Sequence, residues 1–402
     1  MYCAIDVETS KDPCMFPWQQ GSFLVSICAV GSDKEVRTWI INHNDNPDPQ
    51  PHTKILKEVQ SFVDKYKILI AHNLKFDLHW LRAFGLDTSK HTLYCTQVAE
   101  YLLNYQQRSI PISLAETSKR YGITPKIDKV KIFWDSGFDT NEVPLDILIP
   151  YGEQDTINAL TIFYKQQPLI KQYDMKKLFQ VNMGTIRVLE EMEWNGMLVD
   201  TNKIERYSNE YEEKINILNT EFKLALEEKV PELQQIPYNL NSNDHLSVIL
   251  YGGSLVYDGV IPTERILKSG EIKNGTKKGK INIKINGLKF KPLPKTETAK
   301  KGFYKTDEPT LMQLKSTNKV QEKILGYIRE LSRLNKIKNT YFDGIKKFIG
   351  ENNVIHHNLN QTVTITGRLS SSSPNLQNQP RGSTGPSKEI FITRYSQPTE
   401  DT

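Results

Sequence analysis

The chain has 402 residues, of which 38% are hydrophobic and 25% are charged, and its formal net charge is +5 at pH 7. This length predicts two or three domains, and the composition is that of a chain that folds without help. No apolar run reaches the ~18 residues of a membrane-spanning helix, and the first residues lack the pattern of a signal peptide, so we expect a cytoplasmic protein without a membrane partner.

The first forty residues have the composition of consecutive β-strands. The segments YCAIDV, FLVSICAVG and EVRTWII are rich in β-branched or aromatic residues and are bounded by glycine, serine or aspartate. A helix is expected from about Thr53, and the short apolar strand KILIAHN follows it. These segments form the first half of a predicted α/β domain.

Helices follow the last of these strands. One begins near Leu74 and ends at Gly85, a residue type common at helix C-termini, and others are predicted at 93–104 and 150–166. Mixed strands followed by helices predict an α/β domain that ends near residue 172.

From about residue 175 the pattern becomes mainly helical. Residues 203–229 predict a long charged helix with an apolar stripe, and helical periodicity returns after residue 310. Between Arg265 and Lys305 the chain carries thirteen lysines and arginines against two acids. The alternating stretch KINIKINGLKFK in this region predicts a small β-hairpin, and the last fifty residues lose helical periodicity.

Acidic side chains in the first domain are spaced so that they can converge. Asp6 and Glu8 lie two apart on a predicted strand, so their carboxylates share a face. Tyr151 and Asp155 lie four apart on a predicted helix and also share a face. Asp77 lies near the start of another helix. We expect these three places to meet at one site.

Such a site suits the hydrolysis of a phosphodiester. Negative charge builds on the attacking and leaving oxygens, and two divalent cations about 4 Å apart can serve both of them. Mg²⁺ and Mn²⁺ prefer oxygen ligands, which four carboxylates supply together with charge balance. A tyrosine hydroxyl can orient the attacking water. Each spacing alone is common on protein surfaces, and it is the set of three in order that predicts a two-metal nuclease.

The motifs resemble those of a known nuclease family. D-x-E at 6–8, N-x3-D at 73–77 and Y-x3-D at 151–155 look like the three motifs of the DEDD exonucleases with tyrosine in the third motif. The resemblance implies a ribonuclease H-like 3′→5′ exonuclease domain over residues 1–172, with a mixed sheet flanked by helices. By this resemblance, the first metal is held by Asp6, Glu8 and Asp155, the second lies between Asp6 and Asp77, and the strand-binding groove is shaped by Asn73 and Phe76.

The C-terminal half resembles the family A DNA polymerases. TVTITGRLSSSSPNLQNQP at 362–380 is similar to the block that precedes the first palm aspartate of that family. Segments in the same order also fit the family, namely MEWNGMLVD, YNLNSNDHLSVILYG, FYKTDEPTLMQL and KIKNTYFDG. The resemblance implies a mainly helical thumb at 173–350, with a lysine-rich insertion near 253–305 that is similar to phage-type members, and the beginning of a palm at 351–402. A phage-encoded protein would act in the host cytoplasm.

The same resemblance implies contacts with primer–template DNA. Arg368 matches the arginine that reaches the minor groove at the primer terminus, where a contact checks pair shape rather than sequence. Further candidates are amides and lysines that suit groove or phosphate contacts, namely Gln361, Asn375, Gln377, Asn378, Lys336 and Lys338. A plain loop is the alternative explanation for the amides, and a solvated helix face is the alternative for the lysines.

The polymerase resemblance stops before its catalytic residues. Neither of the family's two palm aspartate motifs nor its basic fingers helix occurs in the sequence. We therefore expect a second polypeptide to supply palm and fingers. A split gene, a shortened chain and a partial gene would look the same at the level of sequence.

Three functions compete at this stage. The first is the proofreading exonuclease and thumb portion of a family A DNA polymerase, which acts in DNA replication. The second is a free-standing exonuclease of the RNase D or Werner type with a nucleic-acid-binding domain, and TGRLSSSSPNLQN argues against it. The third is a non-catalytic DNA-binding subunit, and the intact carboxylate set argues against that. The expected partners are a single-stranded DNA 3′ end and a primer–template duplex.

Overall fold

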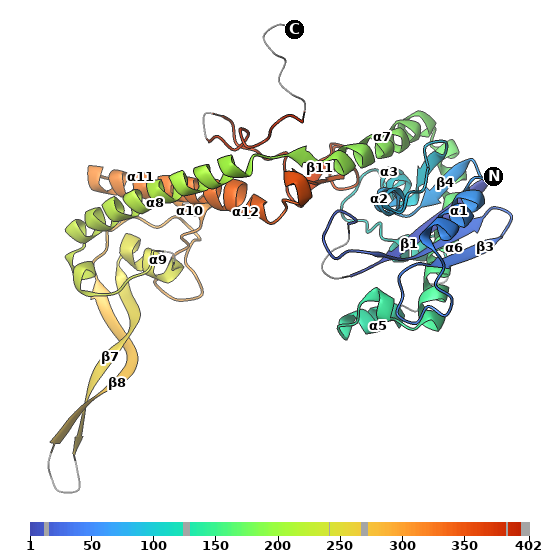
Figure 1. Cartoon of the computed structure of the whole chain (residues 1–402). Helices are drawn as coiled ribbons and strands as arrows, with labels where there is room; N and C mark the ends of the chain where they lie inside the picture. Colours follow the sequence, from blue (N-terminus) through green and yellow to red (C-terminus); the bar gives the residue numbers. More distant parts are fainter. Residues whose placement is uncertain (12–15, 124–128, 241, 267–271, 383–384, 395–402) are drawn as a thin grey trace. The chain divides into compact units, whose positions relative to one another are not determined.

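The computed structural model of the chain divides into two compact units. The structure describes residues 1–11, 16–123, 129–240, 242–266, 272–382 and 385–394 (Figure 1). The first unit comprises Met1–Asp200, Phe348–Gln379 and Phe391–Thr402, and the second comprises Thr201–Lys347 and Pro380–Ile390. The first unit extends past residue 172, where we predicted a domain to end, and it takes in part of the C-terminal segment.

The first unit is built on a mixed five-stranded sheet with the strand order β3-β2-β1-β4-β5. Its strands are β1 (Tyr2–Thr9), β2 (Leu24–Gly31), β3 (Val36–Ile40), β4 (Ile68–Ala71) and β5 (Thr92–Cys95). β1 is antiparallel to β2 and β2 to β3, whereas β1, β4 and β5 run parallel. The predicted strands are therefore confirmed, and β1 lies at the centre of the sheet.

Seven α-helices in the described part of the first unit accompany this sheet. They are α1 (His52–Val63), α2 (Leu74–Phe84), α3 (Thr96–Leu103), α4 (Leu114–Arg120), α5 (Lys129–Asp135), α6 (Leu145–Gln172) and α7 (Lys176–Asn195). Of these, α2, α3, α6 and α7 contact its strands, and α4 and α5 pack against α6. Apolar residues at helical spacing face the core; in α1 these are Ile55, Val59 and Phe62. The core between sheet and helices includes the fully buried Ile5 and Leu69.

Two predicted helices differ from the structure. The prediction of a helix at 93–104 was wrong in its first turn, because Thr92–Cys95 forms β5 and α3 begins only at Thr96. Leu93 and Tyr94 gain a parallel ladder with β4 that helical periodicity alone does not reveal. The helix predicted at 150–166 is longer at both ends, since α6 runs over Leu145–Gln172.

Short strands join the C-terminal segment of the first unit to the residues that follow α7, and pair within that segment. β6 (Met197–Leu198) pairs with β9 (Val354–Ile355), and β10 (Asn358–Asn360) pairs with β11 (Ser370–Ser372). β10 contacts α7 as well. The segment after residue 348 is thereby part of the unit that holds the N-terminal sheet.

The second unit is mainly helical. Its helices are α8 (Thr201–Lys229), α9 (Asn243–Tyr251), α10 (Glu308–Gln313), α11 (Lys319–Ile337) and α12 (Asp343–Lys346). The long helices α8 and α11 pack against each other, and the ring of Phe342 is fully buried beside Tyr207 and Tyr211 of α8. The predicted helix at 203–229 is confirmed. None of the described helices of either unit is long and apolar enough to cross a membrane.

A long β-hairpin projects from this unit beside α9 (Figure 1). Its strands are β7 (Gly253–Ile266) and β8 (Ile272–Ile285), each of 14 residues. The β-hairpin predicted in this region is confirmed, and its strands extend beyond the stretch KINIKINGLKFK. KINIKI is the end of β8, and its partner lies upstream in β7 rather than in the following residues.

Candidate functional site

Three of the predicted carboxylates converge in the first unit. Asp6, Glu8 and Asp155 each offer one oxygen, and these oxygens lie within 4.8 Å of one another. Asp6 and Glu8 project from the same face of β1, and Asp155 is brought to them by α6, which packs against β1. Asp6 and Asp155 are partly exposed and Glu8 is 9% exposed, so a ligand from solution can reach the cluster through Asp6 and Asp155.

A glycine allows α6 to approach the sheet at this point. A Cβ atom at Gly152 would lie 2.7 Å from the Sγ atom of Cys28 and 3.7 Å from Oε1 of Glu8. Real Cβ atoms essentially never come so close to a heavy atom as the first of these distances. Gly152 lies one turn before Asp155, and we infer that its missing side chain sets the distance between Asp155 and β1.

Asp77 lies beside the cluster but is buried. It is 1% exposed, and its Oδ1 accepts a hydrogen bond of 3.2 Å from the backbone N–H of Val7, which lies between Asp6 and Glu8 on β1. Its Oδ2 is buried and has no hydrogen-bond partner among the described residues. Burial and then the charge of Asp6 raise the pKa of Asp77 well above its ordinary value.

This donor set fits a divalent cation. A buried carboxylate oxygen without a partner is costly, and like charges nearby increase that cost. A cation beside Asp77 and the cluster would satisfy the oxygen and offset the repulsion. The ligand atoms are carboxylate oxygens, which suit hard ions such as Mg²⁺ and Mn²⁺ rather than thiophilic metals.

Tyr151 lies one turn before Asp155 on α6 and is half-buried. Its ring packs edge-to-face against Trp134 of α5, with a distance of 6.1 Å between the ring centroids. It also packs against the small apolar cluster of Val25, Val130, Val143 and Leu148. This packing fixes the position of the ring, one helical turn before Asp155.

A pocket of about 320 Å³ brings three predicted DNA-contacting residues together. Asn73, Phe76 and Gln361 all line it, although Gln361 is far away in the sequence. Asn73 precedes α2 in the left-handed backbone region (φ 65°), which asparagine tolerates better than most residues. The predictions did not include other members of the lining, namely Phe16, Lys75, His79, Gln97, Asn358 and Asn360.

A buried ionic network forms one wall of this pocket. Glu193 of α7 is 1% exposed and accepts hydrogen bonds from Lys75, from His79 at 2.8 Å and from the backbone N–H of Leu359. Lys75 also donates to the side-chain oxygen of Asn358 at 2.9 Å and to the carbonyl of Leu359 at 2.6 Å. Strand β10 is therefore fastened to α2, the helix that carries Asp77.

The pKa values of Glu193 and Lys75 reflect opposing effects of burial and of their charged partners. Burial alone would raise the pKa of Glu193, but the hydrogen bond from His79 and the charge of Lys75 together hold it below its ordinary value. Burial lowers the pKa of Lys75, whose ammonium nevertheless keeps three oxygen partners. The pair thus persists as a hydrogen-bonded salt bridge.

The other predicted DNA contacts of the first unit lie on its surface. Arg368, Gln377 and Asn378 are exposed. The side-chain oxygen of Asn375 accepts hydrogen bonds from the backbone N–H groups of Gln377 and Asn378, at 3.1 and 3.3 Å. Asn375 therefore shapes a turn, and this part of the prediction has a structural explanation that needs no DNA.

The two predicted lysines lie in the second unit, and they differ in their exposure and in the ion pairs that their ammonium groups form. The ammonium of Lys338 binds Asp343 at 2.6 Å and Glu212 at 2.9 Å, and its side chain is 16% exposed. Lys336 is 60% exposed and lies 3.8 Å from Glu308. Lys336 can therefore reach a phosphate easily, whereas Lys338 is engaged in ion pairs.

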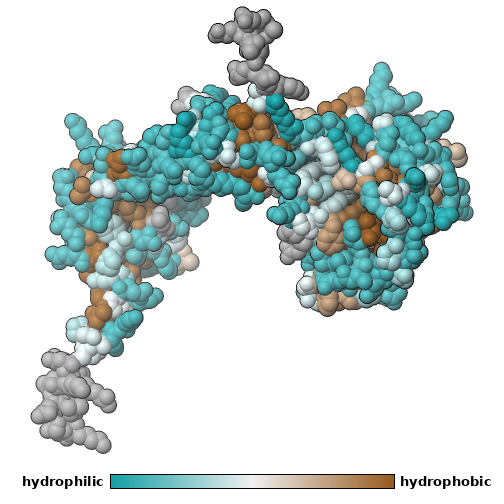
Figure 2. Space-filling view, in the orientation of Figure 1, coloured by the Kyte–Doolittle hydropathy of each residue, from teal (hydrophilic) through white to brown (hydrophobic). Residues whose placement is uncertain are grey.

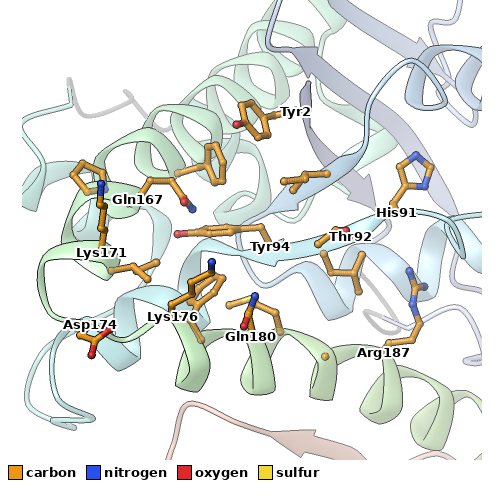
Figure 3. Close-up of a pocket in the computed structure, with 18 of the residues that line it drawn as sticks. Tyr2, His91, Thr92, Tyr94, Gln167, Lys171, Asp174, Lys176, Gln180 and Arg187 are labelled. Carbon is orange, nitrogen blue, oxygen red and sulfur yellow. The ribbon is translucent and has the colours of Figure 1, made fainter.

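A pocket larger than the one beside Asn73 lies elsewhere in the first unit. It measures about 1010 Å³ and is formed by β5, the end of α6 and α7. Figure 3 shows Tyr94 lying across its centre, with Lys171, Lys176 and Arg187 around it. None of the clustered carboxylates lines it, so the size of a cavity does not locate the chemistry here.

Family comparisons match two separate parts of the chain. Residues 2–171 match the model of a 3′–5′ exonuclease domain, and residues 280–397 match the model of DNA polymerase family A. The first match contains all four candidate ligands and Tyr151.

Individual relatives agree with these matches. The DNA polymerase DpoZ of Acinetobacter phage SH-Ab 15497 is 26% identical over 345 residues, which cover 79% of this chain and 47% of the relative. The thermostable DNA polymerase I of Thermus caldophilus is 33% identical over 202 residues, which cover 50% of this chain and 18% of that protein. The chain thus spans less than half of the length of each of these relatives.

A solved structure shares the fold. The structure described as the POL domain of Pol1 from M. smegmatis, in complex with DNA primer-template and dNTP, matches with a TM-score of 0.64. The match covers 97% of this chain and 54% of that chain, at 20% sequence identity. Identity at this level supports a common fold.

Proposed function

We propose that this chain, whose residues 2–171 match a 3′–5′ exonuclease domain and whose residues 280–397 match DNA polymerase family A, removes nucleotides from the 3′ ends of DNA. The observation that carries the proposal is the convergence of Asp6, Glu8 and Asp155 beside the buried, partly unsatisfied Asp77. An all-carboxylate site of this kind, within the part that matches an exonuclease, suits phosphodiester hydrolysis with divalent cations.

We assign roles from this geometry. Asp6, Glu8 and Asp155 would hold one Mg²⁺ or Mn²⁺ ion, and Asp6 together with Asp77 would hold a second. When bound, the two ions neutralise the charge that develops on the scissile phosphate and activate water. Asp77 also fixes α2 against β1 through the N–H of Val7. The packed ring of Tyr151 would place its hydroxyl to orient the attacking water.

The substrate would enter as a single strand. Asn73 and Phe76 line a pocket that also contains Phe16, so amide and aromatic side chains are available to an unstacked base. Unpaired or frayed ends cost less to separate than paired ones. We therefore propose faster hydrolysis of single strands and mismatched termini than of paired 3′ ends, which is the behaviour of a proofreading nuclease.

The rest of the chain would hold the primer–template. We propose an exonuclease domain at 1–172, a thumb and connecting helices at 173–350 and the beginning of a palm at 351–402. Arg368 and Lys336 are exposed, and we propose that both contact the DNA. A free-standing exonuclease of the RNase D type is not favoured, because residues 280–397 match the family A polymerase model.

Templated synthesis would need catalytic aspartates that this sequence does not carry. We propose that a second polypeptide supplies palm and fingers, with both acting in DNA replication in the cytoplasm. Gel filtration and primer extension with a candidate partner test this. A stable complex that extends a primer would support the proposal, and independent elution without synthesis would contradict it.

The nuclease proposal is tested with a labelled single DNA strand and Mg²⁺. The wild-type chain should shorten the strand stepwise from its 3′ end, and a chelator should stop the reaction. Asp155→Asn should be inactive, while Asp135→Asn, a change at an exposed acid of α5, should behave as wild type. Undiminished hydrolysis by Asp155→Asn would refute the site.

A further inference from the structure

The β7–β8 hairpin has two chemically different faces. Strand pairing places Ser254 opposite Lys284, Val256 opposite Asn282, Asp258 opposite Lys280 and Val260 opposite Lys278. Because side chains alternate along a strand, these residues lie on one face. All of them are exposed, and we call this the lysine face: Ser254, Val256, Asp258, Val260, Lys278, Lys280, Asn282 and Lys284.

The opposite face is mainly apolar along the part nearest α9, and the exposed Lys277 lies on it farther out. At the base of the hairpin, Leu255 and Ile285 are each 1% exposed. Farther out, Gly259 and Gly279 face each other, and a Cβ atom on either would lie 2.5 Å from the Cδ1 atom of Ile281 or Ile261. The two isoleucines therefore lie over the glycines. This packing fixes which side chains lie on each face of the hairpin, and it leaves Lys278, Lys280 and Lys284 exposed to solvent on the lysine face.

The lysine face has an excess of positive charge. Lys278, Lys280 and Lys284 form no ion pair with any residue that the structure describes, and Asp258 is the acid among the eight residues of the face. Hydrophilic and hydrophobic residues are both visible along the hairpin in Figure 2. Three cations on a strand whose alternate residues lie about 7 Å apart form a row suited to a polyanion.

We propose that the lysine face binds the phosphate backbone of double-stranded nucleic acid. Lysine is a point charge that contacts phosphates without regard to sequence, and Ser254 and Asn282 add hydrogen-bond donors of the kind used for phosphate oxygens. Proteins that bind single strands add aromatic platforms for the bases, and the lysine face has none. Tyr257 lies on the other face. A duplex therefore fits better than a single strand.

This surface extends the proposed function, on which it rests, because a nuclease that acts on a primer end has a duplex behind that end. The two can be tested separately. Hydrolysis of a short single strand reports on the carboxylate site, and binding of a blunt duplex with Ca²⁺ in place of Mg²⁺ reports on the hairpin.

The first experiment measures duplex affinity of the full chain by fluorescence anisotropy between 50 and 200 mM salt. Each phosphate contact contributes about 0.9 to the slope of log affinity against log salt. The triple variant K278A/K280A/K284A should therefore reduce the slope by about 2.7, and the loss of affinity over this range should shrink about fortyfold. A matched triple on exposed lysines of the first unit, K54A/K57A/K165A, should leave the slope unchanged.

Neighbouring residues on opposite faces give a sharper test. Lys278→Glu should weaken duplex binding several times more than Lys277→Glu, because Lys277 pairs with Ile261 and lies on the other face. Asp258→Asn should strengthen binding, since it removes a negative charge from the lysine face. A folding defect cannot produce that gain, and circular dichroism checks that all variants keep their helices.

Equal salt slopes for the wild type and the lysine-face triple would overturn the proposal, and so would equal losses from Lys277→Glu and Lys278→Glu. A triple variant that binds duplex normally but loses an acidic protein partner would overturn it as well. Retained single-strand hydrolysis together with a reduced slope supports it. A lysine-dependent slope in a chain without hydrolysis would support this surface and contradict the nuclease proposal.

Discussion

The carboxylate site and the lysine face are both sets of like charges, but the fold produces them in different ways. Asp6, Asp77 and Asp155 come from three elements that meet only after the first unit has folded. The lysines come from one strand and are placed by simple alternation. We expect hydrolysis at the carboxylate site to require every ligand. By contrast, we expect duplex affinity to fall stepwise as each lysine of the row is removed. The predictions below test that difference, starting with the largest effect.

Loss of one ligand should nearly abolish hydrolysis. We expect Asp6→Ala to lower the rate on a single strand about a hundredfold or more, as does the loss of a preorganised charge-stabilising group in other enzymes. Stopped assays with a labelled strand measure the rate. A rate within a few-fold of wild type would show that the carboxylates act additively and would erase the contrast with the lysines.

The scaffold of the converging site should be almost as sensitive. Glu193→Gln leaves Lys75 without its buried anion, and breaking one side of a buried pair costs about 3–5 kcal/mol. The free energy of unfolding measures the change. Glu191→Gln on the same helix is the control, because Glu191 is 53% exposed and its ion pair with Arg82 contributes at most about 1 kcal/mol. Equal losses of unfolding free energy from Glu193→Gln and Glu191→Gln would show that the buried ion pair contributes no more than the exposed one.

Acid should remove the same stabilisation. The pKa of Glu193 is lower in the folded chain than its ordinary value of 4.5, so its contribution is complete above that value and is lost as pH falls through the folded pKa. The difference in unfolding free energy between wild type and Glu193→Gln should therefore be largest at neutral pH and shrink below pH 4.5. Urea titrations at neutral and acidic pH measure it. A constant difference would contradict an ionised Glu193.

A residue that only orients water should matter less than a ligand. Tyr151→Phe keeps the ring against Trp134 but removes the hydroxyl. We expect the rate to fall about tenfold, which corresponds to one hydrogen bond of roughly 1–1.5 kcal/mol. Binding of Mn²⁺, followed by calorimetry, should not change. A loss of metal affinity as large as that of Asp6→Ala would instead make Tyr151 part of the metal site.

The smallest effect is expected from a single lysine. Lys284→Ala should reduce the salt slope of duplex binding by about one and lower the affinity only a few-fold. Titrations at several salt concentrations measure the slope. Complete loss of binding from this one change would mean that the lysines, like the carboxylates, act as a unit.

The sequence predicted the site through short-range geometry. Two-residue alternation placed Asp6 and Glu8 on one face, and four-residue spacing placed Tyr151 and Asp155 on one side of a helix, as the structure has them. The buried bond from Val7 to Asp77 joins residues 70 positions apart, and no local pattern predicts it. The roles of these residues remain predictions until they are measured.

Long-range pairing accounts for what the sequence missed. The Glu193 network joins residues up to 284 positions apart, so its members look like ordinary helix-surface charges in the sequence. The full extent of the hairpin was missed for a similar reason. KINIKI has strand alternation, but the choice of its partner depends on the whole of β7.

The discontinuity of the first unit has a consequence for the order in which the chain is completed on the ribosome. Strand β6 finds its partner β9 only after 156 further residues, and Glu193 finds the N–H of Leu359 after 166. The N-terminal sheet can form early, but α7 keeps a buried charge without all of its partners until the segment around residue 359 emerges. During that interval the second unit has already been made, so it folds as an insertion into a unit that is still open.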